Sequence, residues 1–307
     1  MLRRVMAALV LTGMCCHALL AQPLSIVEIA PGVFVHQGQI ALMSEENKGD
    51  IANIGFIVGT ESVAIVDTGG SMSEGRAFLL ALREKTDKPI RWVINTHAHP
   101  DHIFGNGAFV GDGVDFAGHR RLASAVASRG PHYIAAFRKT MGAALDGVRI
   151  VAPTLAVDDA ITLDLGGRSI VLAAWPAAHS DCDLTVLDQK TGTLFAGDLV
   201  FVDHVPILDG SLRGFLEVVD RLDRIAATRV VPGHGPVSAP WPAALRAEKA
   251  YLMELAADLR AAIRDGATVA AASKSAALSE RTHWRMFDEY NAGNATAGFA
   301  ELEWEMP

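Results

Sequence analysis

Four side chains that can bind a metal ion lie within six residues of one another, directly after an apolar segment. His97, His99, Asp101 and His102 follow the run Trp-Val-Ile-Asn-Thr at residues 92–96. Three imidazoles and a carboxylate are costly to bury together in an apolar interior. Imidazole nitrogen and carboxylate oxygen are the ligands that zinc and related divalent ions take in proteins. The spacing therefore predicts a metal site, and a polar surface loop that is rich in histidine is the alternative.

Three later residues repeat one arrangement further along the chain. His179, Asp198 and His234 each follow a small or turn residue at the end of an apolar stretch. We expect each of them where a strand meets a loop, because loops over a rigid scaffold are where sites are usually built. One such residue alone would more often be a surface or turn residue, but their occurrence after the first cluster indicates a shared site. The seven candidate metal ligands are His97, His99, Asp101, His102, His179, Asp198 and His234.

Seven ligands are enough for two ions, and the spacing suggests how they divide. Residues i and i+2 of an extended segment face the same way. His97 and His99 are therefore expected to hold one ion, which His179 would complete. Asp198 has two carboxylate oxygens and could bridge this ion to a second one.

The second ion is expected on the other half of the first cluster. Asp101 and His102 project differently from the preceding histidines, and His234 would complete their site. Each ion would keep an open position, which is typical of a catalytic rather than a structural site. A hydroxide shared by two ions roughly 3.5–4 Å apart is a strong nucleophile at neutral pH.

The order of these motifs resembles a known family. His-x-His-x-Asp-His, a distant His, Gly-Asp and Gly-His-Gly, preceded by Val66-Asp67-Thr68-Gly69, is similar to the metallo-β-lactamase superfamily over roughly residues 26–240. The resemblance implies an α/β fold, a four-layer αββα sandwich of two mixed β-sheets with helices on the outside and the metal site at one edge of the sheets. It also implies that Asp67 orients the ligand loop, since metal-bound histidines need partners that set their tautomer.

Finer resemblances bear on the chemistry and the setting. The β-lactamases of the superfamily usually have Cys or Ser where this chain has Asp198, and an aspartate there resembles the glyoxalase II, lactonase and esterase branches, where it bridges the metals. Residues 294–305 are similar to the ending of exported zinc metallohydrolases of a quinoprotein relay system and of sulfur-oxidation accessory hydrolases. The second resemblance implies a periplasmic setting but no substrate.

Composition and the N-terminal residues limit the class of protein to which the chain can belong. The chain has 307 residues, half of them apolar, and a net charge of −8, so it lacks the basic footprint of a nucleic-acid-binding protein. Residues 1–21 are predicted to be a signal peptide, with a short basic start, an apolar stretch of about ten residues and a small residue before the cleavage point. We therefore expect a periplasmic or secreted protein with no membrane span in the mature chain; a retained membrane anchor is the alternative.

Residues 22–307 are predicted to form a single domain with a short C-terminal helical and aromatic tail. Residues 53–59 and 63–67 read as a buried hairpin, and residues 71–85 as a helix. Residues 119–129 and 132–144 read as two helices that Gly-Pro separates.

Five side chains outside the ligand set are further candidates for a role. His204 could contact substrate, although a surface histidine is the commoner case, and Cys182 reads as a packing residue because no base for a nucleophile is identifiable. Asp183 could support the ligand loop or could equally be a turn aspartate. Phe299 and Trp304 are expected to pack in the core, and a pocket wall is the alternative.

The sequence thus predicts a metal-dependent hydrolase of an ester, thioester, lactone or lactam that uses a metal-bridging hydroxide on a small-molecule substrate. Two divalent ions are implied; zinc is the first expectation, and iron and manganese accept the same ligand mix. Asp198, as the bridge, and Asp101, as a ligand that could also shuttle a proton, are the predicted catalytic residues. A mononuclear iron enzyme of the persulfide dioxygenase type and an accessory metal protein of a periplasmic redox system are the alternatives, and no oligomeric state is predicted.

Overall fold

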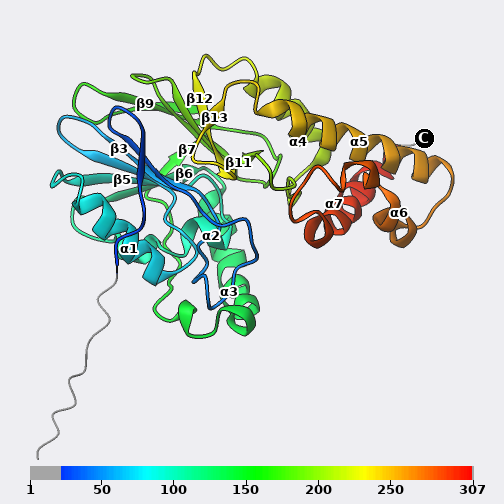
Figure 1. Cartoon of the computed structure of the whole chain (residues 1–307), viewed down its shortest axis with the longest axis horizontal. Helices are drawn as coiled ribbons and strands as arrows, with labels where there is room; N and C mark the ends of the chain where they lie inside the picture. The colour runs from blue at the N-terminus through cyan, green and yellow to red at the C-terminus, as the bar shows by residue number, and fades with distance from the viewer. Residues whose placement is uncertain (1–21, 306–307) are drawn as a thin grey trace, which may run out of the picture.

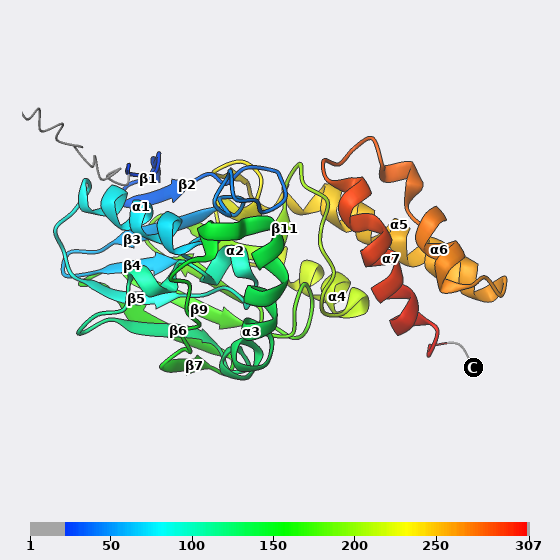
Figure 2. The same ribbon diagram turned by 90° about the horizontal axis from the view of Figure 1, so that it is seen from below.

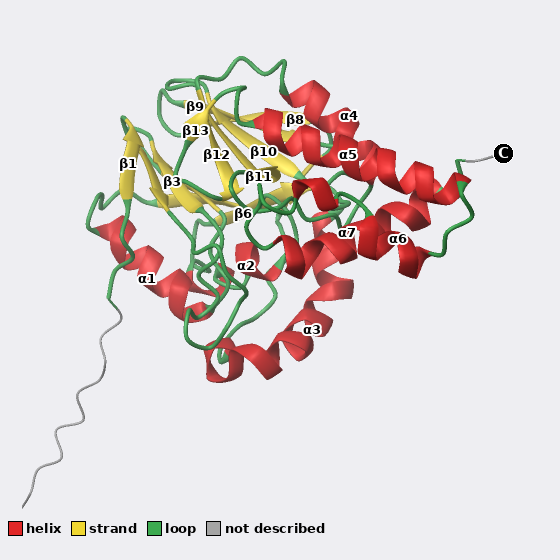
Figure 3. Cartoon of the chain, turned by 45° about the vertical axis from the view of Figure 1, so that its right-hand side comes forward, coloured by secondary structure: helices red, strands yellow, loops and turns green. Residues whose placement is uncertain are grey.

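Two β-sheets lie face to face between two layers of helices in the computed structural model, which describes residues 22–305 (Figures 1 and 3). The predicted α/β class and αββα layering are therefore confirmed. The predicted signal peptide lies outside the described residues. No helix of the described part is both long enough and apolar enough to cross a bilayer.

The first sheet has seven strands, which follow one another in chain order. Its first four strands pair antiparallel, and the last four pair parallel from β4 onward. The parallel pairing follows from the strand–helix–strand order, since parallel neighbours need a crossover connection. The strands are β1 (Val27–Ala30), β2 (Val33–His36), β3 (Ile54–Val58), β4 (Val63–Val66), β5 (Ile90–Ile94), β6 (Asp115–His119) and β7 (Leu155–Val157).

The second sheet has six strands in the order β13-β12-β11-β10-β9-β8, and only β11 and β12 pair parallel. The predicted hairpin of residues 53–67 lies in the first sheet as β3 and β4. The strands of the second sheet are β8 (Ala160–Asp164), β9 (Ser169–Ala174), β10 (Leu184–Asp188), β11 (Thr193–Phe201), β12 (Arg229–His234) and β13 (Ala239–Pro240).

Alternation along the strands sends side chains into two separate cores. In β4, Val63 and Ile65 pack toward the helix α1 (Met72–Arg83), whereas Ala64 and Val66 pack between the two sheets. Because successive residues of a strand face opposite sides, a run with apolar residues at every position indicates a strand that is buried on both faces. This is why the run at 63–66 has no polar residue.

Helices cover each sheet on its outer face. The α1 helix and α3 (Leu122–Met141) lie on the side of the first sheet, and α4 (Leu212–Leu222) and α5 (Leu245–Arg264) lie on the side of the second (Figure 3). The α1 helix begins at Ser71, whose hydroxyl accepts a hydrogen bond from the backbone of Glu74 at 3.1 Å, as expected of an N-cap. The predicted helix of residues 71–85 is thus confirmed.

The prediction of two helices around Gly130-Pro131 is wrong. The α3 helix runs through both residues without a break. Proline removes one backbone donor and normally kinks or ends a helix. Here the turn before it is buried through Ala125 and Val126, and Gly130 lies so close to Ile150 that a Cβ atom would approach it to 2.6 Å. This tertiary packing outweighs the local preference of proline.

The C-terminal residues form two further helices, α6 (Val269–Ser275) and α7 (Phe287–Leu302), which extend the molecule beyond the sheets (Figures 1 and 2). Phe299 lies in the core next to α4 and α5, as predicted. Trp304 is 84% exposed, so the prediction that it packs in the core is wrong. The α7 helix also reaches the loop that precedes α4: Asn294 accepts a hydrogen bond from the backbone of Leu208 at 2.9 Å and donates one to the carbonyl of Pro206 at 2.6 Å.

Candidate metal centre

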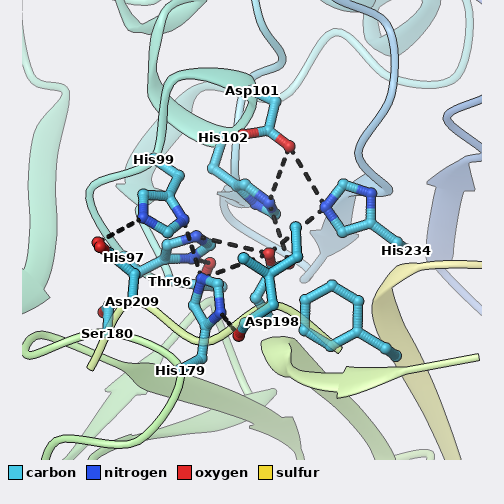
Figure 4. Close-up of polar contacts among 12 residues, drawn as sticks. Thr96, His97, His99, Asp101, His102, His179, Ser180, Asp198, Asp209 and His234 are labelled. Carbon is cyan, nitrogen blue, oxygen red and sulfur yellow. Dashed lines mark hydrogen bonds and ion pairs between the residues drawn. The ribbon is translucent and has the colours of Figure 1, made fainter. Parts of the chain in front are cut away.

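The seven predicted ligands come from four segments that meet at one edge of the two sheets (Figure 4). The first cluster follows β5 and enters α2 (Pro100–Ile103), a single turn that carries Asp101 and His102. His179 lies in the loop between β9 and β10, and His234 is the last residue of β12. The same edge therefore receives side chains from both sheets.

Asp198 differs from the prediction in its local setting. It lies inside β11, which continues to Phe201, rather than at the end of a strand. The pairing of β11 with β12 is irregular at Gly197, whose φ of +53° is a left-handed conformation that glycine tolerates best. This bulge lets the Asp198 side chain leave the sheet toward the other ligands.

The first group of ligands comprises His97, His99, His179 and Asp198, whose ligand atoms lie within 4.8 Å of one another. The Nε2 atom of His179 lies 2.9 Å from Nδ1 of His99 and 3.5 Å from Oδ2 of Asp198. Nε2 of His97 lies 3.8 Å from the same oxygen. Atoms that surround one tetrahedral zinc ion at about 2.0–2.1 Å are roughly 3.3 Å apart, so these separations are of the right size.

The second group comprises Asp101, His102 and His234, again with ligand atoms within 4.8 Å. Nε2 of His234 lies 3.3 Å from Oδ2 of Asp101 and 3.4 Å from Oδ2 of Asp198. The other Asp198 oxygen lies 3.1 Å from Nε2 of His102. Asp198 therefore lies between the two groups, which are the two groups that the i, i+2 spacing predicts.

Partners on the far side of each ring orient the histidines of the first group. Nδ1 of His179 donates to the carbonyl of Ile207 at 2.8 Å, and Nδ1 of His97 lies 3.0 Å from the hydroxyl of Thr96. His99 is turned the other way, with Nε2 3.0 Å from a carboxylate oxygen of Asp209 and Nδ1 toward His179. The atoms that face the site are thus Nε2 of two rings and Nδ1 of the third. Histidines that bind a metal usually need such a partner on the other ring nitrogen, because it fixes the tautomer and the orientation of the ring.

The second group is oriented in the same way. Nδ1 of His234 donates to the carbonyl of Ile51 at 2.9 Å, and Nδ1 of His102 lies 2.8 Å from Oδ2 of Asp67. Asp67 also accepts hydrogen bonds from the backbone and hydroxyl of Thr96 at 2.8 and 2.7 Å. One carboxylate thereby contacts both the ligand loop and a ligand ring, so the predicted orienting role of Asp67 is consistent with its contacts.

Several inward atoms are buried without a hydrogen-bond partner in the described chain: Nε2 of His97, His102 and His234, and Oδ1 of Asp198. His102 and Asp198 approach each other but are not aligned for a hydrogen bond. A buried polar atom without a partner costs about 1–3 kcal/mol. Divalent ions would satisfy all four atoms, and the donor set of imidazoles and carboxylates fits such ions.

Neighbouring charges in the second group keep its carboxylate ionised and His234 protonated. Burial opposes ionisation, but His102 and His234 lower the pKa of Asp101 to about 2. Burial likewise opposes protonation of His234, yet Asp198 and Asp101 raise its pKa to about 9. In the first group, burial lowers the pKa of His179 to about 4. Without an ion, a proton would therefore bind to His234 of the second group in preference to His179 of the first.

A pocket of about 540 Å³ opens over the ligands. His99, Asp101, Asp198 and His234 line its floor, and residues of α3, α7 and the 42–51 and 207–209 loops form its walls. This volume lies in the usual range for small-molecule sites.

The remaining candidate residues have clear positions. His204 is buried with its ring 5.0 Å from that of His234, so the surface interpretation is wrong, and it does not line the pocket. Cys182 is buried in an apolar cluster, and burial raises the pKa of its thiol to about 12, which confirms a packing role. Asp183 accepts hydrogen bonds from the backbone and hydroxyl of Ser180 and so braces the His179 loop.

Sequence reasoning did not identify Thr96, Asp209 or the Ile207 carbonyl. Thr96 directly precedes the first ligand, and its position is the one signal that could have suggested a role. Asp209 comes from a loop 110 residues after His99, and the sequence carries no sign of their contact.

Known proteins resemble the chain in sequence. The acyl-coenzyme A thioesterase MBLAC2 of Bos taurus is 28% identical over 214 residues, which cover 61% of this chain and 74% of that protein. The linear primary-alkylsulfatase of a Pseudomonas species is 42% identical over 67 residues, but these cover only 22% of this chain and 13% of that protein.

Solved structures resemble the chain in fold, and a family model matches it. The inverting sec-alkylsulfatase Pisa1 of Pseudomonas sp. has a TM-score of 0.72 at 14% identity, over 91% of this chain and 50% of that one. A metallo-beta-lactamase from Pontibacter korlensis has a TM-score of 0.61 at 19% identity, over 75% of this chain and 99% of that one. The model of the metallo-beta-lactamase superfamily matches residues 47–234, a segment that contains all seven predicted ligands. The chain therefore belongs to the metallo-beta-lactamase superfamily, whose members similar to it are hydrolases.

Proposed function

We propose that this protein is an exported hydrolase of an ester-like bond (ester, thioester, lactone or lactam) that works with two divalent metal ions. The observation that carries the proposal is the position of Asp198, whose oxygens lie within 3.5 Å of ligand nitrogens from both groups. Oδ2 lies near nitrogens of both groups and Oδ1 near His102 of the second group, so this carboxylate is suited to bridge two ions. Three further ligands on each side would leave open positions for water and substrate.

Each residue has a definite task in this proposal. His97, His99 and His179 would hold one ion and Asp101, His102 and His234 the other, with Asp198 between them. When bound, the two ions supply a Lewis acid and a hydroxide at neutral pH.

Hydrolysis adds the oxygen of one water molecule to the carbonyl carbon and breaks the carbon–oxygen, carbon–sulfur or carbon–nitrogen bond to the leaving group. Asp101 belongs to the second group and also lines the pocket, so its carboxylate is placed to pass a proton to that leaving group. The products are a carboxylic acid and an alcohol, a thiol or, from a lactam, an amine.

The relatives support an ester-like bond. One is named as an acyl-coenzyme A thioesterase and another, similar over a short segment, as a linear primary-alkylsulfatase, so one name denotes hydrolysis of a thioester and the other hydrolysis of a sulfate ester. The aspartate at position 198, in place of the cysteine or serine that is usual in the β-lactamases, makes a lactam the least favoured of the four bonds. Zinc is the proposed metal, because it takes imidazole and carboxylate ligands with an open position.

The test is elemental analysis of the purified protein together with a panel of thioesters, esters, lactones and lactams. We expect about two ions per chain, loss of hydrolysis on chelation and recovery when zinc is added back. His102→Ala should lower the metal content toward one ion and reduce turnover by at least a hundredfold. Activity that survives complete removal of metal would refute the proposal, and a single iron with oxygen consumption on a persulfide would replace it with the dioxygenase.

The proposed export has its own test. Cell fractionation should place the protein in the periplasm, and the N-terminal residue of the purified chain should be Gln22. A chain that stays in the cytoplasm and begins at Met1 would contradict export without bearing on the hydrolase.

A further inference from the structure

Apolar side chains make up much of the lining of the pocket over the ligands. They include Leu42, Ile51, Phe137 of α3 and Ile207. Leu42 is 53% exposed, so an apolar surface continues from the pocket to its mouth. Among residues 22–305, no lysine or arginine lines the pocket.

Glu289 is the acidic side chain of the pocket that is placed to repel an anion. Bound ions would offset the charges of Asp101 and Asp198, and Asp209 is paired with His99 and with Arg129 at 3.0 and 3.5 Å. Glu289, on α7, is exposed at the wall and forms no ion pair in the described part of the chain. The guanidinium of Arg129, which is paired with the pocket residue Asp209, is also paired with Asp181 at 2.9 Å. These two carboxylates offset its charge, so it would attract an anionic substrate only weakly.

Tyr290 brings a polar group to this apolar wall. It precedes the Asn294 that anchors α7, it lines the pocket together with Asp101 and Asp198, and its ring lies 5.3 Å from that of His204. Burial raises the pKa of its hydroxyl above an ordinary value that already lies well above neutral pH, so the phenol is protonated. A protonated phenol can donate a hydrogen bond to a substrate oxygen.

We propose that the pocket selects an uncharged ester or thioester with a hydrocarbon acyl chain, with the chain against Phe137 and Leu42, the Tyr290 hydroxyl donating to the substrate and Glu289 excluding anionic groups. The inference rests on the proposed hydrolase function and names its substrate class. Acyl-coenzyme A molecules and sulfate esters are anionic, so both would be poor substrates despite the names of the relatives.

Chain length tests the apolar wall. With thioesters of N-acetylcysteamine from acetyl to octanoyl, kcat/KM should rise about fourfold for each added methylene that is buried, because burial of one CH₂ is worth about 0.8 kcal/mol. Phe137→Ala should flatten this increase without changing the metal content. A flat series in the unaltered protein would overturn the assignment of the chain subsite.

Charge is tested with a matched pair of substrates, S-octanoyl-N-acetylcysteamine and S-octanoyl-3-mercaptopropionate, which differ in the charge of the leaving group. We expect kcat/KM to favour the neutral thioester by at least tenfold and Glu289→Lys to reduce that preference about tenfold, since it reverses the charge nearest the wall. Glu303→Lys is the control, because it makes the same charge change at the residue that follows α7, about 21 Å further along the helix axis. An equal effect of both variants, or preference for the anionic substrate, would overturn the role of Glu289.

Tyr290→Phe keeps the ring against His204 and removes only the hydroxyl. We expect kcat to fall by about ten- to a hundredfold, with unchanged metal content and melting temperature and little change in KM. Unchanged kcat would overturn the role of Tyr290.

The two proposals can fail separately. If the metal-loaded protein hydrolyses no substrate of the panel, the proposed function is wrong, and the proposed substrate class is then wrong as well. If it hydrolyses the thioesters without regard to chain length or charge, the hydrolase stands and the substrate class is wrong.

Discussion

Asn294→Ala should loosen one metal site and spare the other. The Asn294 amide, which is 2% exposed, holds Leu208 and Pro206 in the loop before α4. That loop supplies the Ile207 carbonyl to His179 and the Asp209 carboxylate to His99. The substitution removes both contacts and a third, in which the Asn294 amide donates to the hydroxyl of Tyr251 at 2.9 Å. It also leaves the buried Leu208 amide without an acceptor, which costs about 1–3 kcal/mol in the free energy of unfolding.

The effect on metal binding should be selective. Loss of a partner behind a ligand ring typically weakens metal binding by 10- to 100-fold, or about 1.4–2.7 kcal/mol. We expect this loss at the site of His97, His99 and His179 only, because the partners of His102 and His234 are Asp67 and the Ile51 carbonyl, which Asn294 does not contact. Competition with a chromophoric chelator should therefore resolve one weakened and one unchanged zinc-binding constant.

Asn291→Ala provides the matched control. Asn291 lies one turn earlier on α7, is 4% exposed and makes two hydrogen bonds, to Tyr251 at 2.8 Å and to the Ala276 carbonyl at 3.0 Å. It holds α7 to its helical neighbours and does not contact the ligand-bearing loop. Its substitution should lower the melting temperature to a similar extent and leave both zinc constants unchanged. Equal weakening by the two variants would show that general loosening, and not the loop, is responsible.

Three further predictions follow from the geometry of the site. Gly233→Ala would place a Cβ atom 1.9 Å from Oδ1 of Asp198, so we expect both ions to be lost, as measured by elemental analysis; two retained ions would contradict the bridging geometry. The pKa of His234 is raised to about 9 and that of His102 is raised as well, despite burial, by Asp198, Asp101 and Asp67, so metal must displace protons from this group at lower pH. The second zinc constant should therefore fall at least about tenfold for each unit from pH 8.5 to 6.5, and a constant independent of pH would refute this sign. Cys182, with a thiol pKa raised to about 12, should react with iodoacetamide at pH 8 at least a hundredfold more slowly in the folded than in the denatured protein, and equal rates would contradict its burial.

Local patterns in the sequence predicted individual buried strands and the convergence of the ligands, whereas the four layers were predicted from the resemblance to the superfamily. The apolar run at 63–66 is a strand buried on both faces, and the strand–helix–strand order around α1 agrees with the parallel pairing of β4 and β5. The i, i+2 spacing of His97 and His99 correctly anticipated two groups of side chains. That these groups bind metal remains a prediction.

The errors arose where distant packing overrides a local preference. A proline at position 131 is a helix-breaking signal, but the contact of Gly130 with Ile150 keeps α3 continuous. His204 reads as an ordinary loop histidine, but the rings of Phe201 and Tyr290 enclose it. No periodic pattern in the sequence predicts either contact, because each one forms only when separate segments of the chain pack together.

The C-terminal helix shows what such docking adds to the site. The segment 294–305 stood out in the sequence through a resemblance, and packing of Phe299 and Trp304 was the one physical role expected of its residues. In the fold, Asn294 and Glu301 of α7 bind the backbone of the loop at Leu208 and Leu212, so the segment supports the partners of two ligand rings. The same helix places Tyr290 at the pocket wall. Removal of α7 should therefore impair metal binding at one site as well as substrate choice, and a shortened chain that bound two ions normally would show that the superfamily core builds this centre alone.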